Sequence, residues 1–303
     1  MNARRLLVSA ALPLLPALLA FACGGGNENL PPPPPPPAPP PAEAPPAAAS
    51  AAPSASVETP PAPPPAPPPT LAQGTQSPDP PAPTPTVKFL APAANQVIPA
   101  AKAGDFQVKL DVKNWKTAPG DAHVHLILDD KPYKPIYDTK APVKLSDLPG
   151  GDALAPGQHI LVAFPSRANH ESVKTPGALA VLQFWVDKKG DVNQDVKKPM
   201  LIYSRPKGDY KGDMANHVLV DFYLANEKLS QGGDHVHITV TGPGAPNDGL
   251  TADATQWGPP FFLDSLQDGS YQVKLDLLDK DGKTVPGGWS SVTRNINVAH
   301  QAQ

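Results

Sequence analysis

Short apolar segments and turns alternate through the chain after residue 86. Runs of alternating apolar and polar residues are interrupted by Gly, Pro, Asn and Asp. The interruptions come roughly every 8 to 12 residues, the spacing typical of an all-β sandwich. No stretch keeps the 3.6-residue period of an amphipathic helix. The pattern therefore predicts an all-β fold.

The same pattern occurs twice, with a constant offset of 112 positions. Matched positions in the two copies carry the same class of residue, which indicates a duplicated domain. We predict two tandem immunoglobulin-like β-sandwiches, over residues 87–188 and 199–300, joined by a linker at 189–198. The matching segments are FQVKLDVKN (106–114) with VLVDFYLAN (218–226), DALAPGQH (152–159) with DSLQDGSY (264–271), and Phe184 and Val186 with Ile296 and Val298.

Each copy contains a His-Val-His strand. His123 and His125 lie in GDAHVHLILDD (120–130), and His235 and His237 lie in GGDHVHITVTG (232–242). Side chains alternate between the two faces of a strand, so the intervening Val and Leu residues should face the core. We therefore expect the four histidines to point towards water.

Two imidazoles at i and i+2 on one strand face lie about 7 Å apart and can converge on one ion. A stable site needs a third donor, and His170 in the polar loop RANHES is the best candidate. The first sandwich can thus offer three ligands, while the second keeps only His235 and His237. Imidazole suits copper or zinc. The alternative is a solvated strand face without metal, and His159 is expected to have a structural role as a corner residue.

The first sandwich resembles a family of uncharacterised bacterial envelope domains that carry a GHHHLLID strand, then LPPGKHTL, then a histidine-containing loop. DAHVHLILD, LAPGQHILV and RANHES are the corresponding stretches here. The histidine content of that family implies metal handling. Val124 stands where the family has its central histidine, and the segment PIYDTKAP lacks the histidine expected there.

The inter-domain segment GDVNQDVKKP (190–199) offers a second kind of site. Asp191, Asn193 and Asp195 supply alternate oxygen donors, and the run resembles the calcium linker of cadherins. Calcium needs six to eight oxygens, and Val196 replaces the glycine that an EF-hand loop has at this point. The alternative is an ordinary polar linker.

The first 23 residues combine two arginines, an apolar stretch and a cysteine. This predicts a signal peptide over residues 1–22. LLAFAC followed by GGGNEN resembles the bacterial lipoprotein signal, which implies a lipid on Cys23 as the membrane anchor. Gly24 follows the cysteine in place of Asp, and by the same resemblance the outer membrane is the expected location.

Residues 23–86 are predicted to be a disordered, proline-rich linker. Residues 31–85 hold 26 of the 45 prolines of the chain. Such a segment favours polyproline II and acts as a semi-rigid spacer. Recognition by an aromatic groove of a partner is the alternative.

Composition excludes several functions. The net charge is −3, without a basic stripe, so no nucleic acid partner is expected. No motif of a nucleophilic or metal-dependent enzyme occurs, and the single cysteine excludes an internal disulfide.

We expect a non-enzymatic cell-envelope lipoprotein that displays two modules for an unknown protein or glycan partner or for envelope organisation. Copper or zinc binding is the alternative. The four tryptophans allow glycan or peptidoglycan binding, although packing is the simpler role.

Overall fold

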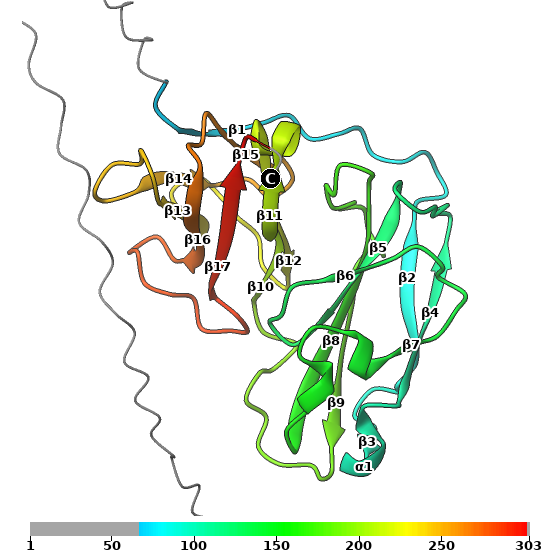
Figure 1. Cartoon of the computed structure of the whole chain (residues 1–303). Helices are drawn as coiled ribbons and strands as arrows, with labels where there is room; N and C mark the ends of the chain where they lie inside the picture. The colour runs from blue at the N-terminus through cyan, green and yellow to red at the C-terminus, as the bar shows by residue number, and fades with distance from the viewer. Residues whose placement is uncertain (1–66, 302–303) are drawn as a thin grey trace, which may run out of the picture. The chain divides into compact units, whose positions relative to one another are not determined.

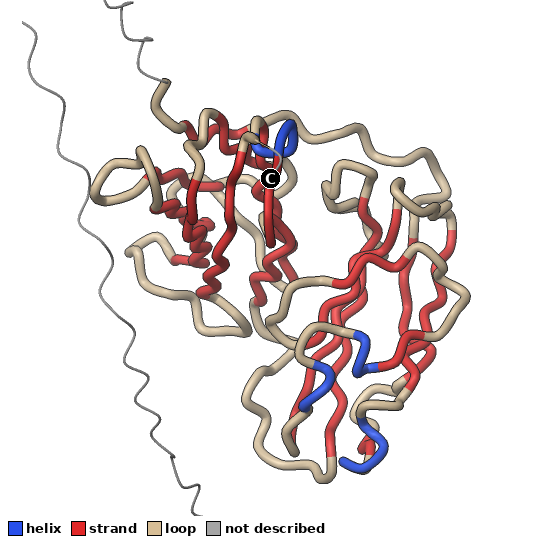
Figure 2. Tube along the Cα trace, viewed as in Figure 1, coloured by secondary structure: helices blue, strands red, loops and turns tan. Residues whose placement is uncertain are grey.

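The chain folds into two β-sandwiches in a computed structural model that describes residues 67–301 (Figures 1 and 2). The predicted signal peptide, Cys23 and the first part of the predicted linker lie outside the described residues. In the part of the chain that the structure describes, helical structure is limited to short turns: α1 (Ala100–Ala103) and the 3-10 turns η1 (Leu145–Asp147), η2 (Gly151–Ala153) and η3 (Gly212–Ala215). Within residues 67–301, no helix has the length and apolar character that a membrane crossing requires.

The first sandwich consists of a three-stranded sheet, in the order β2-β4-β7, and a five-stranded sheet, in the order β3-β9-β8-β5-β6. Apolar residues alternate along the strands and meet in a core between the sheets, which includes Val124, Leu126 and Phe184. The bounds are β2 (Thr86–Ala91), β3 (Val97–Ile98), β4 (Gln107–Lys113), β5 (His123–Leu128), β6 (Lys134–Ile136), β7 (Val143–Lys144), β8 (Gly157–Ser166) and β9 (Ala180–Val186).

The second sandwich repeats this arrangement. One sheet has the order β1-β15-β12-β10 and the other the order β11-β17-β16-β13-β14. Strand β11 pairs in parallel with β17 as β3 does with β9. The bounds are β10 (Met200–Arg205), β11 (Gly208–Lys211), β12 (His217–Ala225), β13 (His235–Thr241), β14 (Leu250–Ala254), β15 (Phe261–Asp264), β16 (Gly269–Leu278) and β17 (Ser291–Ala299).

The offset of 112 aligns most strands of the two sandwiches, whereas β14 and β15 lie farther along the chain than this offset places β6 and β7. The offset places β8 on β16 and the first residue of β5 on the first residue of β13. The predicted all-β class with two sandwiches is therefore confirmed.

The predicted disorder of the linker does not hold for its last part. Strand β1 (Thr70–Gln73) pairs antiparallel with β15 and extends the second sandwich by one strand. The strand is possible because residues 70–77 contain no proline, so their N–H groups are free to pair. The chain then continues to β2 of the first sandwich.

The two sandwiches share an apolar interface. The sheet face of the first sandwich that turns away from its own core contributes Ile160, Val162 and Phe164, and these pack with Met200 and Ile202 of β10. Both sandwiches belong to one compact unit of the chain. Arg294 of the second sandwich strengthens the junction, because its guanidinium Nη2 lies 2.7 Å from Oδ1 of Asp130.

Candidate metal centre

Three histidines of the first sandwich converge at this interface. His123 and His125 stand on the same face of β5, and His170 lies in the loop between β8 and β9. The Nε2 atom of His123 lies 3.0 Å from Nε2 of His125 and 3.0 Å from Nδ1 of His170. Among the described residues, these three form the one group of His, Cys, Asp or Glu side chains with ligand atoms gathered within 4.8 Å. The three predicted ligands of the first sandwich are thus brought together.

The surroundings fix the orientation of each ring. The Nδ1 atom of His123 lies 2.7 Å from the carbonyl oxygen of Asp121, so it carries the proton and donates it. The Nε2 lone pair of His123 therefore points into the cluster. His125 Nδ1 lies 3.2 Å from Ser204 Oγ of the second sandwich, and the His125 ring stacks on Tyr133 with centroids 3.4 Å apart. The Tyr133 hydroxyl lies 3.2 Å from Nδ1 of His170.

The backbone places His170 by a tight turn. The His170 N–H donates to the carbonyl of Arg167, and the Arg167 N–H donates to the carbonyl of Glu171. His170 has a φ of 68°, a left-handed conformation that is uncommon for residues other than glycine. The second sandwich contains the same turn, in which Asp279 and Lys283 make the equivalent bonds and Gly282 has a φ of 75°.

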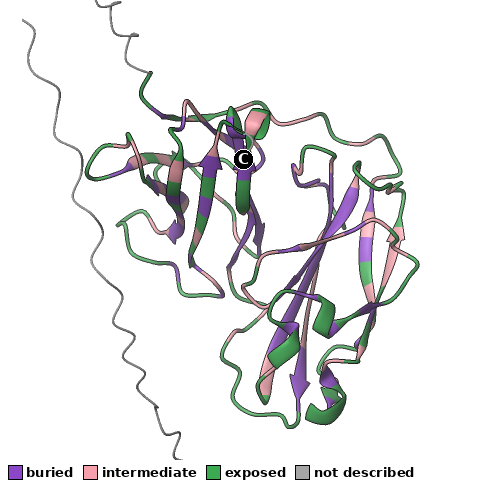
Figure 3. Ribbon diagram, in the orientation of Figure 1, coloured by how far each residue is buried: buried purple, intermediate pink, exposed green. Residues whose placement is uncertain are grey.

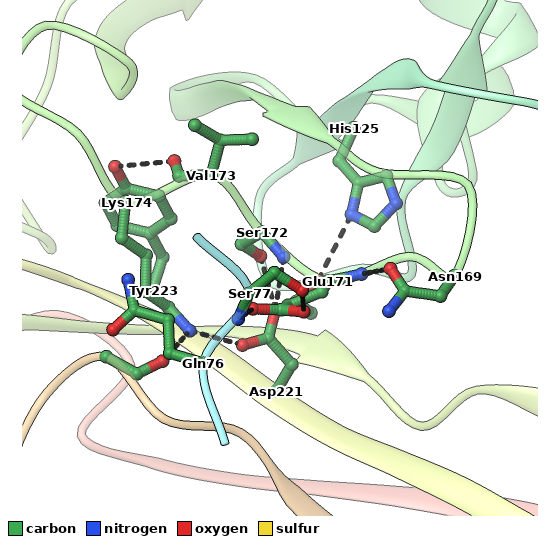
Figure 4. A network of polar contacts seen from close by, with 12 residues as sticks. Gln76, Ser77, His125, Asn169, Glu171, Ser172, Val173, Lys174, Asp221 and Tyr223 are labelled. Atoms are coloured by element: carbon green, nitrogen blue, oxygen red, sulfur yellow. Dashed lines mark hydrogen bonds and ion pairs between the residues drawn. The ribbon is translucent and has the colours of Figure 1, made fainter. Parts of the chain in front are cut away.

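A buried polar network holds the loop that carries His170 against the second sandwich (Figure 4). The Lys174 ammonium donates to Asp221 of β12 at 2.6 Å, and both side chains are almost fully buried. Ser172 donates to the same carboxylate through its N–H and its hydroxyl. On the other side of the loop, Ser77 donates to the Glu171 carboxylate through the same two groups. The third ligand therefore depends on β12 and on the segment after β1.

Burial sets the protonation state of the cluster. Desolvation lowers the pKa of His123 and holds the pKa of His125 well below its ordinary value. Burial and the Arg205 charge lower the pKa of His170 to about 3. All three imidazoles are thus neutral at pH 7, and neutral imidazole is the form that binds a metal.

The expectation that the histidines of the first sandwich face water is wrong. His123 and His125 point away from the core of their own sandwich, as the alternation predicts, but both are 0% exposed. The whole of strand β5 is buried (Figure 3). The second sandwich covers this face. The signal for this burial is the run Ile160–Phe164 of the neighbouring strand, because a continuous apolar run indicates burial on both faces.

The second His-Val-His strand has different surroundings. His235 Nδ1 lies 3.1 Å from the carbonyl of Gly233, which repeats the contact between His123 and Asp121. His237 Nδ1 lies 2.6 Å from the exposed Asp253 carboxylate. Both rings are partly exposed, so the expectation of a solvent-facing pair holds here. No third histidine completes the set, because Gly282 occupies the position of His170.

His159 stays outside the cluster, in agreement with its expected structural role. Its Nε2 lies 2.8 Å from the carbonyl of Ala155, and its Nδ1 lies 2.8 Å from Asp129 Oδ2. The matching Tyr271 hydroxyl also bonds the chain four residues earlier, at the N–H and carbonyl of Gln267. Burial opposes protonation of His159, but the hydrogen bond to Asp129 raises its pKa overall.

The other residues predicted to form sites show no convergence on an ion. Asp191 and Asn193 are exposed in the inter-domain segment, and Asp195 accepts the backbone N–H of Lys197. The four tryptophans pack against the protein and do not form an exposed aromatic surface. Trp185 is 3% exposed, and the others pack partly buried against the cores.

Two cations beside the cluster were not predicted. Arg205 is the last residue of β10 and Lys207 follows the strand, and their charges lower the pKa values of all three histidines in addition to burial. The Lys207 ammonium lies 3.8 Å from the centroid of the Tyr133 ring and donates to the Tyr133 carbonyl. Burial and the Arg205 charge lower the pKa of Lys207 to about 8. No spacing in the sequence links these residues to a strand 80 positions earlier.

Comparisons with known proteins give information only about the fold of this chain. No family model and no curated protein matches the sequence. Similar solved structures include the fibronectin(III)-like modules of Clostridium thermocellum CbhA, at 14% identity and a TM-score of 0.25, covering 72% of this chain and 97% of that one. The tandem V-type regions of VCBP3, a v-region-containing chitin binding protein, show 9% identity and a TM-score of 0.21 over 71% and 99%. Domains 4 and 5 of the S-layer protein SbsC show 11% identity and a TM-score of 0.19 over 71% and 98%.

Proposed function

We propose that this protein is a cell-envelope lipoprotein whose first sandwich binds one divalent transition-metal ion, copper or zinc, at His123, His125 and His170. The observation that carries the proposal is the approach of Nε2 of His123 to ring nitrogens of the other two histidines, at 3.0 Å each. One lone pair cannot accept two well-aligned hydrogen bonds, so hydrogen bonding alone satisfies this arrangement poorly.

A bound metal ion satisfies all three nitrogens at once. Ligand nitrogens in a tetrahedral zinc site lie about 3.3 Å apart, given metal–nitrogen distances of about 2.0 to 2.1 Å. The spacing from His123 to its two neighbours is close to that value. Asp121 and Ser204 contact the remaining ring nitrogens of His123 and His125, as outer partners of metal-bound histidines commonly do.

The donor set favours particular metals. Three neutral imidazoles suit Zn(II) and Cu(II), and a site with three protein ligands leaves a coordination position for a solvent molecule or another ligand. Within residues 67–301, the cluster includes no cysteine or carboxylate. A soft Cu(I) site and an oxygen-rich calcium site therefore fit this arrangement less well.

The envelope location rests on the sequence. The signal-like segment, Cys23 and the proline-rich stretch are consistent with a lipid-anchored protein whose two modules stand away from a membrane. Replacing Cys23 with Ala should move the protein from the membrane fraction to the soluble fraction. Membrane retention of the Cys23→Ala variant would refute the lipid anchor and leave the metal site as a separate question.

Metal titration with a matched pair of variants tests the site. Cu(II) and Zn(II) are titrated into metal-free protein by calorimetry, and the stoichiometry and affinity are measured. His123→Ala should weaken binding at least about 100-fold, beyond the 10- to 100-fold cost typical of residues that only orient a ligand. His235→Ala removes the equivalent histidine of the second sandwich and should leave the affinity unchanged. Binding no tighter than millimolar, or equal losses in both variants, would refute the proposal.

A further inference from the structure

A pocket opens beside His170, the one histidine of the cluster that is partly exposed. It has a volume of about 310 Å³, and its lining includes His170, Arg205, Asp209 and Tyr210. His123 and His125 are 0% exposed, whereas His170 is partly exposed. The pocket therefore joins the surface of the protein to one ligand of the proposed metal site.

Arg205 lines this pocket and carries a donor that the described residues leave without an acceptor. Its Nη1 donates to the Tyr210 hydroxyl at 3.1 Å. Its Nε is buried and, among the described residues, has no acceptor. A buried donor of a charged group without a partner is costly, so such groups usually have a partner. The register of β10 shifts between Tyr203 and Arg205, and irregularities of this kind commonly redirect a side chain next to a functional site.

The charge balance of the site calls for an anion. A divalent ion on three neutral imidazoles brings two positive charges close to Arg205 and Lys207. Both cations lie over the Tyr133 ring, with Lys207 Nζ 3.8 Å and Arg205 Cζ 5.3 Å from its centroid, and Lys207 also donates to the Tyr133 carbonyl. The carboxylate of Asp209 also lines the pocket, where it accepts from Asn297 at 3.0 Å, and its single negative charge leaves the sum of these charges positive. An anion from outside would neutralise charge and give the Arg205 guanidinium an acceptor.

We propose that a small oxyanion, a carboxylate or a phosphate, enters this pocket, occupies the remaining coordination position of the metal and pairs with Arg205. This inference rests on the proposed metal site and names its ligand class. A bound oxyanion also explains why Arg205 lies beside a cation site, because Arg recognises carboxylates and phosphates through paired N–H donors.

Anion titration of the Cu(II)-loaded protein tests the inference. Formate and inorganic phosphate are added separately at constant ionic strength, and the Cu(II) electron paramagnetic resonance spectrum is followed. The wild-type spectrum should change saturably with at least one of the two probes, which identifies the preferred source of the oxyanion. Arg205→Gln should weaken that anion at least about tenfold while Cu(II) affinity stays equal to or tighter than wild type.

Two further variants act as controls. Lys211→Gln removes an exposed positive charge from neighbouring β11 and should leave anion affinity unchanged. Arg205→Lys keeps the charge but loses the planar donor set, so its affinity should fall between those of wild type and Arg205→Gln. Arg205→Lys also tests the role of Arg205 in anion binding if Arg205→Gln does not fold.

The outcomes separate the two proposals. Absence of Cu(II) binding overturns this inference, and absence of both Cu(II) and Zn(II) binding overturns the metal site as well. Cu(II) binding without a saturable anion response overturns the inference alone. Equal anion affinity in wild type and the Arg205 variants also overturns it.

Discussion

The two His-Val-His strands occupy the same place in two copies of one sandwich, but only one belongs to a three-histidine cluster. In both copies the first histidine donates to a carbonyl two residues earlier, and in both the following hairpin closes with the same turn. In the first copy, His170 stands at the left-handed position of that turn and Ser204 contacts His125. In the second copy, the turn has Gly282, and His237 bonds an exposed carboxylate.

The difference shows that the motif supplies two donors but does not by itself make a site. The third donor comes from one residue of a loop. Burial comes from another domain, which covers the face of β5 and β8 with residues of β10 and β12. The two copies share the first of these elements and differ in the others.

The largest expected loss of stability comes from breaking the contact between the second sandwich and the loop that carries His170. Asp221→Ala leaves the buried Lys174 ammonium with the Gly258 carbonyl but without its carboxylate partner, a loss that typically costs about 3 to 5 kcal/mol of unfolding free energy. Urea unfolding measures this loss, and calorimetry should show weaker metal binding in the same variant. Asp105→Ala, which breaks an exposed pair with Lys144, is the control and should have no measurable effect. A similar result for the two variants would mean that the buried network does not hold the loop.

Exchanging the turn residues tests the comparison directly. His170→Gly should weaken the first site at least about 100-fold, since it removes a ligand and keeps a permissive backbone. Gly282→His should strengthen metal binding at His235 and His237 by about 10- to 100-fold, which calorimetry would detect as a second equivalent. Gly282→Ala controls for strain at the positive φ and should add no metal. If Gly282→His behaves like Gly282→Ala, the third donor alone does not distinguish the copies.

Acid should destabilise the metal-free protein through the three histidines of the cluster. An unfolded histidine titrates near pH 6.5, whereas the pKa values of these three are lowered in the folded state. The unfolded chain therefore binds more protons below pH 6.5. Stability is full above that pH and falls as the pH decreases towards the folded pKa values. His125 alone should contribute a slope of up to about 1.4 kcal/mol per pH unit.

Urea unfolding at pH 7.5 and pH 5 with a chelator present measures this slope. The raised pKa of His159 acts in the opposite sense, so the slope must be compared with that of a His125→Gln variant. An unchanged slope in this variant would show that His125 is not held neutral by the fold.

The smallest effect is expected from the outer contact that differs between the copies. Ser204→Ala removes the partner of His125 Nδ1 and should weaken metal binding about tenfold. Asp253→Ala removes the corresponding partner of His237 and should leave the first site unchanged. Calorimetry of the two variants checks the difference. A loss in Asp253→Ala would place metal binding on the second strand instead.

Much of the fold could be predicted because it depends on local patterns. The period of two, the turn spacing and the offset of 112 were enough to predict the two sandwiches and the equivalence of most of their strands. His170 was also predicted as the third donor, from its polar loop. The edge strand β1 was missed, because it is only four residues long and lies inside a proline-rich segment.

The sequence by itself determined the β class, the duplication and the histidines that face away from each core, since these follow from side-chain alternation along single strands. Tertiary structure alone decided that one pair is buried and neutral, and that Ser204, Arg205 and Asp221 contribute to its surroundings. All three residues lie 79 positions or more from His125 along the chain, and no local period relates them to it. Burial and pKa depend on what packs across an interface, and that is set by the meeting of two surfaces rather than by either strand.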